Sequence, residues 1–469
     1  MRNGYRWMGS LFVALSLFVA LSLFGCQQTT VTKKGATPAI PPQTVAAEKP
    51  LPIPVHPWMW MSGARSEKDP RAYGAYGAEG VAAPGNTPPA VSFASAWTGP
   101  HGSLWLLGGQ GRHLMTRAGL WKYTPATGLW TRVGGIPSPR YGAAVWARDG
   151  SVWVFGGGGV SPGGSTPVPP TLDSLWRYTP KSGWVRIGGP YVNAVQDAVL
   201  AHSVRGTRGV ASPKNWPGSL RQAAAWTGLH GHFWLFGGEG EGNTRNSLWK
   251  YTPATHMWTW MGGPSWHWHE CCGWSAKPAV YGTRGVPTPE NWPGARDSAV
   301  AWVGLRGNLW LFGGSNDSVA KSDLWKYTPK TGLWTWMGGS RHSSQPGVRA
   351  ALGVPAPTNW PRARYDAVGW TGPHGNLWLY GGGHISDTLE AFVDCHSVWK
   401  YTVTTGLWTW MGSGHRAGNE KTGFIGPRGV PTDEGPSGAA FSSAWTGLHG
   451  HFWVFGGHRN LNDLWRYTP

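Results

Sequence analysis

Charged residues are scarce in this sequence, at 13% of 469 residues, whereas soluble domains usually carry about 25%. Disordered chains combine high charge with few aromatic residues, but this chain has 35 Trp, 14 Tyr and 13 Phe. A disordered chain is therefore excluded. Long helices are excluded as well, because 72 Gly and 39 Pro recur throughout and both destabilise helix interiors. The remaining class is a turn-rich all-β protein with an aromatic core.

Acidic residues are the rarer charged type, with 22 Asp and Glu against 40 Lys and Arg, which gives a formal charge of +18. A positive surface suits anionic partners such as lipid phosphates, acidic glycans or acidic peptides. Nucleic acid is not predicted as a partner, because no long basic run or recognition helix occurs.

Long apolar runs are also missing, apart from one near the N-terminus at residues 11–24, preceded by Arg2 and Arg6. A basic start and a short apolar run are typical of an export signal. The segment Leu23-Phe24-Gly25-Cys26 resembles the lipobox of bacterial lipoproteins, which implies lipidation of Cys26 and a membrane anchor. The alternative is an ordinary signal peptide.

These features predict three parts: a signal peptide at residues 1–25, a Pro-rich tether at 26–56 and a folded domain at 57–469. By the same resemblance, Gln27 implies the bacterial cell envelope, at the outer membrane where the host has two membranes.

A repeated pattern of four short apolar segments dominates the rest of the chain. Its first two segments are Trp-x-Gly-x-x-Gly, then hydrophobic-Trp-hydrophobic-aromatic-Gly-Gly; a third reads Leu-Trp-Lys/Arg-Tyr-Thr and a fourth Trp-x-x-Met/Val/Ile-Gly. Six copies of the second segment begin near the following residues: Leu104, Val152, Phe233, Leu309, Leu377 and Phe452. Units of four strands at a period of 40–50 residues indicate propeller blades.

The fourth strand of the sixth unit is missing at the C-terminus, because the chain ends at Leu464-Trp-Arg-Tyr-Thr-Pro469. Its counterpart occurs near the N-terminus, where Trp58-Met-Trp-Met-Ser-Gly63 matches Trp258-Thr-Trp-Met-Gly-Gly263. The sequence therefore predicts a six-bladed propeller of four-stranded blades in which residues 58–63 complete the last blade and remove the open edges.

A Gly-Gly pair followed by a Tyr, and by a Trp six or seven residues later, is the kelch signature, as in Tyr123 with Trp130. Over residues 58–469 the chain resembles bacterial kelch-repeat lipoproteins with a galactose-oxidase-like propeller. The resemblance implies ligand binding on the face that carries the long loops. It also leaves open an enzyme, because kelch propellers include copper oxidases and a sialic-acid mutarotase.

Loops between the second and third strands and between blades share one face, since strand direction alternates. This face carries all the long insertions. Gly-Val and Asn-Trp-Pro recur in the interblade loops, as in Gly285-Val286 and Asn291-Trp292-Pro293, which favours a structural role for them. Long loops on a rigid scaffold remain the expected place for binding.

Arginines precede the first strand of four blades: Arg140, Arg221, Arg296 and Arg364. One interpretation is a ring of forked cations around the channel mouth that binds a carboxylate or sulfate. The other is that each guanidinium bonds loop carbonyls. Blades one and six have Val91 and Ala439 instead.

Two loops contain unusual clusters, Trp266-His-Trp-His-Glu-Cys-Cys-Gly-Trp274 and Val393-Asp-Cys-His-Ser397. One interpretation is a disulfide among Cys271, Cys272 and Cys395 in an oxidising compartment. A second is a copper or zinc site built from His267, His269, Cys271, His384 and His396. A third is sugar stacking on Trp266, Trp268 and Trp274.

No nucleophile–base pair or phosphate loop is recognisable, so a non-catalytic binding protein without cofactor is favoured. Its expected partners are an anionic or carbohydrate ligand or a protein. The alternative is an oxidase-like or mutarotase-like enzyme on the same face.

Overall fold

The computed structural model divides the chain into two units, Met1–Glu48 and Lys49–Pro469. It describes residues 57–66, 69–160, 170–189, 202–240, 243–263, 267–269, 273–275, 278–316, 318–386, 391–413, 427–433, 435–436, 439–458 and 461–469. The predicted signal peptide, Cys26 and the tether lie outside these residues.

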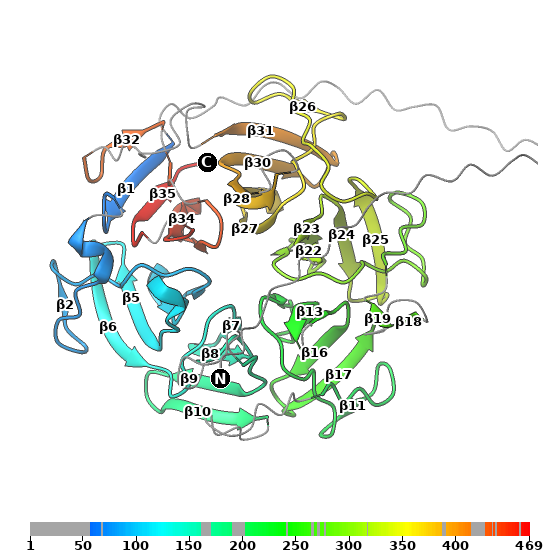
Figure 1. Cartoon of the computed structure of the whole chain (residues 1–469), viewed down its shortest axis with the longest axis horizontal. Coiled ribbons are helices and arrows are strands. Elements are labelled where there is room, and N and C mark those ends of the chain that lie inside the picture. The colour runs from blue at the N-terminus through cyan, green and yellow to red at the C-terminus, as the bar shows by residue number, and fades with distance from the viewer. Residues whose placement is uncertain are drawn as a thin grey trace, which may run out of the picture. The chain divides into compact units, whose positions relative to one another are not determined.

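Six antiparallel sheets form a ring, which confirms the predicted six-bladed propeller (Figure 1). The innermost strand of each blade, here strand a, contacts strand a of both neighbouring blades around the whole circle. These strands are β3 (Ser95–Thr98), β7 (Ala144–Arg148), β12 (Ala224–Thr227), β20 (Val300–Val303), β27 (Tyr365–Thr371) and β33 (Ser443–Thr446).

Strands b and c follow outward. The b strands are almost wholly buried, as their apolar sequences require, and are β4 (Leu104–Leu107), β8 (Ser151–Phe155), β13 (Phe233–Phe236), β21 (Leu309–Phe312), β28 (Leu377–Ile385) and β34 (Phe452–Phe455). The c strands are β5 (Gly119–Thr124), β9 (Leu175–Thr179), β16 (Leu248–Thr252), β24 (Leu324–Thr328), β30 (Ser397–Thr402) and β35 (Leu464–Tyr467).

The d strands are β6 (Leu129–Gly135), β10 (Gly183–Gly188), β17 (Met257–Gly262), β25 (Leu333–Gly338), β31 (Leu407–Ser413) and β1 (Trp58–Ser62). Strand β1 pairs with β35, with Trp58 opposite Tyr467 and Trp60 opposite Trp465. The prediction that the N-terminal strand completes the last blade is therefore confirmed.

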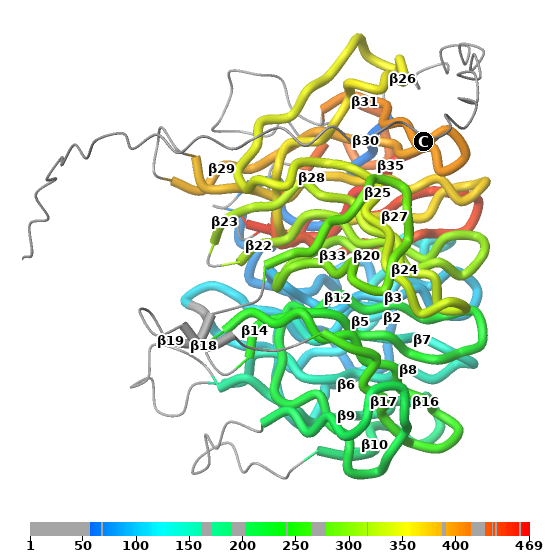
Figure 2. Tube along the Cα trace, turned by 90° about the vertical axis from the view of Figure 1, so that its right-hand side faces the viewer, coloured from blue at the N-terminus to red at the C-terminus, as the bar shows by residue number. Residues whose placement is uncertain are grey.

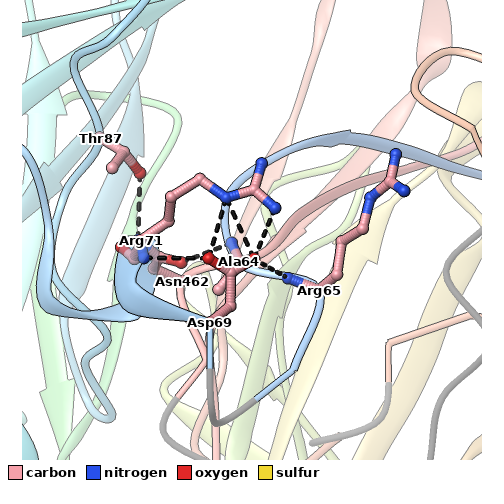
Figure 3. Close-up of polar contacts among 6 residues, drawn as sticks. All are labelled: Ala64, Arg65, Asp69, Arg71, Thr87 and Asn462. Carbon is pink, nitrogen blue, oxygen red and sulfur yellow. Dashed lines mark hydrogen bonds and ion pairs between the residues drawn. The ribbon is translucent and has the colours of Figure 1, made fainter.

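A buried amide reinforces this closure (Figure 3). Asn462 Oδ1 accepts from the Ala64 N–H at 2.7 Å, and its Nδ2 donates to the carbonyls of Arg71 and Pro88, both at 2.7 Å. Asp69 bonds Arg71 on the same segment. Since Asn462 lies two residues before strand c of blade six, one side chain joins both ends of the propeller.

Tryptophans connect neighbouring blades. The indole N–H of a strand-a Trp donates to the carbonyl of the strand-b Trp in the next blade, at 2.8–3.2 Å. These pairs are Trp146 with Trp234, Trp226 with Trp310, Trp302 with Trp378, and Trp445 with Trp105. The last pair joins blade six to blade one.

Four blades have a fifth, two-residue outer strand that was not predicted: β2 (Ala82–Ala83), β11 (Ala211–Ser212), β26 (Pro355–Ala356) and β32 (Pro431–Thr432). Each comes from the loop before strand a and pairs with strand d of its own blade. Asn215 Nδ2, for example, donates to the carbonyls of Val210 and Trp258 in blade three, and Asn291 Nδ2 makes the same two bonds in blade four. The structural role predicted for the recurring Gly-Val and Asn is thus confirmed, and the outer sheet edges are covered.

The remaining elements are short. Hairpins and single strands extend the loops: β14 (Glu239–Gly240), β15 (Asn243–Thr244), β18 (His267–His269), β19 (Gly273–Ser275), β22 (Ser315–Asn316), β23 (Val319–Ala320) and β29 (Phe392–Asp394). Helical turns are η1 (Pro70–Tyr73), η2 (Pro100–Gly102), η3 (Arg112–Leu114), η5 (Pro373–Gly375) and η6 (Leu448–Gly450). Among the described residues no helix has the length and apolarity needed to cross a membrane.

The two faces of the ring differ, as predicted. Strands β14, β22, β23 and β29 project from one side, here the loop face (Figure 2). The a–b and c–d turns form the opposite side, here the turn face.

Candidate functional site

Three of the four predicted arginines are buried in the blades. The exposed fraction is 1% for Arg140, 1% for Arg296 and 2% for Arg364. Each Nη1 donates to the carbonyl of the first glycine of its blade's Gly-Gly pair, at 2.8–3.0 Å. The geometry corresponds to the second interpretation of these arginines, in which they bond loop carbonyls, because their donors face the protein interior.

Arg296 also forms a buried ion pair. Its Nη1 and Nη2 contact the Asp323 carboxylate at 2.6 and 2.8 Å, and both side chains are 0% exposed. Burial alone would raise the pKa of Asp323, but the charge and hydrogen bonds of Arg296 hold that pKa below its ordinary value. Trp325 donates a further bond to this carboxylate. This cluster fixes the b–c corner of blade four.

Arg221 occupies a different position. In three blades the carbonyl that lies against a glycine of the preceding blade belongs to the arginine: Arg140, Arg296 or Arg364. In blade three this carbonyl belongs to Leu220. Arg221 is one residue further along. Its guanidinium pairs with Glu239 and donates to the Tyr141 hydroxyl at 2.8 Å.

The residue that follows Arg221 and its counterparts in the other five blades form a closed ring of backbone hydrogen bonds. Each N–H donates to the carbonyl of its counterpart in the neighbouring blade, at 2.7–3.1 Å, and all six residues have φ between 52° and 60°. They are Phe93, Gly142, Gln222, Ser298, Asp366 and Phe441. A left-handed φ costs a non-glycine residue about 1 kcal/mol or more, and the circular bonding offsets that cost. This ring narrows the channel where it opens on the loop face.

A polar cleft of about 290 Å³ lies beside the ring, between blades three, four and five. Side chains with both donor and acceptor groups line it: Gln222, Glu239, Asn243, Thr244, Asp297, Ser298, Ser315, Ser318, Tyr365 and Asp366. Ser315 donates to Asp297 at 2.7 Å, and Gln222 lies 3.4 Å from Asp366. The cleft can therefore hydrogen-bond a polar ligand from several sides.

Two carboxyl groups in the cleft bind protons unusually tightly. Burial raises the pKa of Asp297 to about 6, although Ser315 lowers it by donating a hydrogen bond. Burial raises the pKa of Asp366 well above its ordinary value, and the charge of Asp297 adds to the shift. Carboxyls perturbed in this way inside a cleft are frequent at functional sites.

An aromatic group lies next to this cleft on the same rim. The ring centroids of Phe93 and Phe441 are 4.6 Å apart, and those of Phe441 and Phe392 are 5.1 Å apart. Phe392 also contacts Tyr365, which lines the cleft. The channel mouth thus combines a carboxyl-rich side with an aromatic side.

The cysteine-bearing loop of blade five reaches the same rim. Cys395 has no disulfide partner among the described residues, and its Sγ lies 3.6 Å from His384 Nδ1; Asp394 lies 3.3 Å from His458 Nδ1. Within the part of the chain that the structure describes, no three His, Cys, Asp or Glu residues are grouped to hold a metal ion. A metal site that includes His384 and His396 would therefore need ligands from outside the described residues.

The other predicted cluster is described only in part. His267, Trp268 and His269 form strand β18, which pairs with β19 around Trp274. Trp266, Cys271 and Cys272 lie outside the described residues, so the predicted disulfide and metal site stay predictions.

Comparison with known proteins points to the kelch group. The chain is 35% identical over 78 residues to beta-scruin of Limulus polyphemus, a kelch-repeat protein. The match covers 17% of this chain and 8% of beta-scruin, so the chain spans a small part of that relative. A scan against protein-family profiles gives no match. With the six-bladed ring, the similarity supports a kelch propeller.

Sequence reasoning missed Glu239, Asp297 and Asp366. The signal available was the one-residue offset of Arg221 from the other arginines, which marks the position that faces the channel mouth. Alignment of the six blades on the Trp of strand a identifies this position and the next one as the lining of the mouth.

Proposed function

We propose that this chain is a non-catalytic binding module that holds a carbohydrate at the channel mouth on its loop face. The observation that carries the proposal is the polar cleft between blades three and five, with amide, hydroxyl and carboxyl groups beside an aromatic group. Sugar hydroxyls pair with such groups, and ligand sites usually combine a few polar groups with apolar walls. A volume of about 290 Å³ suits a small ligand or the end of a glycan chain.

An uncharged glycan fits better than the acidic ligand expected from the net charge. Three arginines direct their donors inward, and Arg221 is paired with Glu239. Asp297, whose pKa is about 6, is ionised at neutral pH and would repel an anion at this place. Kelch-like similarity alone suggests an interaction module, so a partner protein carrying the glycan is consistent with the proposal. We further propose lipidation at Cys26 and a location in the bacterial cell envelope, on the resemblance of residues 23–26.

The test is a glycan array followed by calorimetric titration of the best glycan. Asp297→Asn and Asp366→Asn should each weaken binding at least ten-fold, because they remove a hydrogen-bonding carboxyl from the cleft. Neither change should lower the melting temperature at pH 7.5, since each removes an unfavourably buried charge. Asp149→Asn is the matched control, because Asp149 is 81% exposed on an a–b turn of the opposite face. Absence of glycan binding, or equal binding by all three variants, would overturn the proposal.

A second candidate is acid–base catalysis on the bound sugar, favoured by the raised pKa values of Asp297 and Asp366. One protonated and one ionised carboxyl can exchange a proton with a sugar hydroxyl. NMR of the bound glycan would report mutarotation or hydrolysis, and either rate should fall to background in both variants. Binding without turnover would support the binding module alone.

A further inference from the structure

The turn face carries apolar side chains around the channel opening. Five of the six a–b turns have one at the tip, here called the crown: Pro100, Leu229, Leu305, Pro373 and Leu448. The exposed fraction is 69% for Leu305, 64% for Leu229 and 55% for Leu448. These three are among the five most exposed large apolar residues recorded for the described chain.

Leucines of the crown contact the following turn at three of the blade junctions. Leu229 covers Gly307 of the next blade, Leu305 covers Gly375, and Leu448 covers Gly102. A Cβ at any of these glycines would come within about 2.6 Å of the leucine, so the leucines are held in place by the turn that follows.

The charge around the crown is positive. The a–b and c–d turns of this face contain four fixed cations, Arg148, Lys181, Arg306 and Lys330, and one carboxylate, Asp149. Histidines follow the apolar residue in four of the turns: His101, His230, His374 and His449. All of these residues are exposed.

The N-terminal end of strand β1 lies at this face too. Strand d runs from the turn face to the loop face, and the Thr468 N–H donates to the Pro57 carbonyl at 2.9 Å. Thr468 Oγ1 in turn lies 3.3 Å from Nδ1 of His451, directly after an a–b turn. The described chain therefore enters the propeller at residue 57 on the turn face, where the crown lies.

We propose that the crown docks the propeller on a bilayer surface that contains anionic lipid. Exposed single apolar tips flanked by cations match shallow insertion at a lipid interface with anionic headgroups. In this orientation the carboxyl-rich channel mouth faces away from the membrane. The proposal is independent of the proposed carbohydrate site on the other face.

Flotation with vesicles of phosphatidylcholine and phosphatidylglycerol in a 3:1 ratio tests the docking. The protein is residues 49–469, the second unit, whose ring and core are complete without the apolar run at 11–24. This unit should float with the vesicles, and Leu229→Ser, Leu305→Ser and Leu448→Ser combined should lower the bound-to-free ratio at least ten-fold. Vesicles of pure phosphatidylcholine should bind at least three-fold less of this protein.

The matched control combines Val210→Ser, Val286→Ser and Val430→Ser, which are 53%, 45% and 46% exposed on the outer edge of the blades. It should bind within two-fold of the unchanged unit. Failure of the unchanged unit to float would overturn the proposal, as would equal binding by the crown variant. Light scattering tests the alternative that a second copy of the chain binds the crown. A dimer that dissociates in the crown variant would support that alternative and overturn the proposal.

Discussion

At the residue scale, the same side chain has opposite consequences in two blades. Asp323 and Asp463 both directly precede strand c, and both accept a bond from the indole N–H two residues later. Asp323 faces the guanidinium of Arg296, whereas Ala439 replaces the arginine in blade six. Burial raises the pKa of Asp463 to about 6.

The pair gives a matched prediction. Asp323→Asn should lower the free energy of unfolding by about 3 kcal/mol at pH 7.5, because it leaves Arg296 buried without its counter-charge. Asp463→Asn should leave that free energy unchanged or raise it by about 1 kcal/mol, because an amide still accepts the indole bond and carries no charge. Chemical denaturation measures both. Equal losses in the two variants would contradict this account of the buried pair.

The positions of the arginine side chains show what sequence reasoning cannot predict at the residue scale. A run such as Arg296-Asp297-Ser298 places its first residue in the blade, its second in the cleft and its third in the hydrogen-bonded ring. Sequence identifies the conspicuous cation, but not the left-handed φ that turns the next residues toward the axis. The sequence therefore identified the loop face and the arginines, but not the carboxyl side chains that line the cleft.

At the element scale, the closing strand was predictable because its residues repeat those of a complete blade. Trp58 and Trp258 occupy the same place in strand d, and both are 1% exposed. Trp58 packs against Tyr380, Trp465 and Tyr467. The outer strands were not predictable, since two residues paired through backbone hydrogen bonds leave no periodic pattern.

This equivalence can be measured. Trp58→Ala and Trp258→Ala should lower the free energy of unfolding by similar amounts, about 3–5 kcal/mol each, because both leave a large cavity. Met115→Ala is the control, because Met115 is 55% exposed, and it should cost less than about 1 kcal/mol. A Trp58→Ala variant as stable as the unchanged chain would mean that the N-terminal strand does not close the ring in solution.

At the scale of the whole molecule, buried carboxyls should set the pH dependence of stability. Burial raises the pKa of Asp173, Asp297 and Asp463 to about 6 each, and that of Asp366 further. The folded state then holds more protons than the unfolded state between about pH 4 and 6, so stability falls as pH rises through this window.

Other groups modify the expected profile. Burial lowers the pKa values of His232 and His451, which opposes the trend below about pH 6.5. Arg71 and Arg296 lower the pKa values of Asp69 and Asp323, and their contribution is lost only below about pH 4. Four carboxyls outweigh two histidines, so the melting temperature should be about 2 °C or more higher at pH 5 than at pH 7.5. A melting temperature that rises over this range would contradict the burial of these carboxyls.

The fold places one carboxyl-rich mouth on the loop face and one apolar crown on the turn face. The proposed carbohydrate site is tested most directly by hydrogen–deuterium exchange with and without the best glycan from the array. The account predicts protection at residues 221–223, 239–240, 243–244, 297–298, 315–316, 318 and 365–366, around the channel mouth. Protection confined to the turn face or to the outer edges of the blades, with none at the mouth, would contradict it.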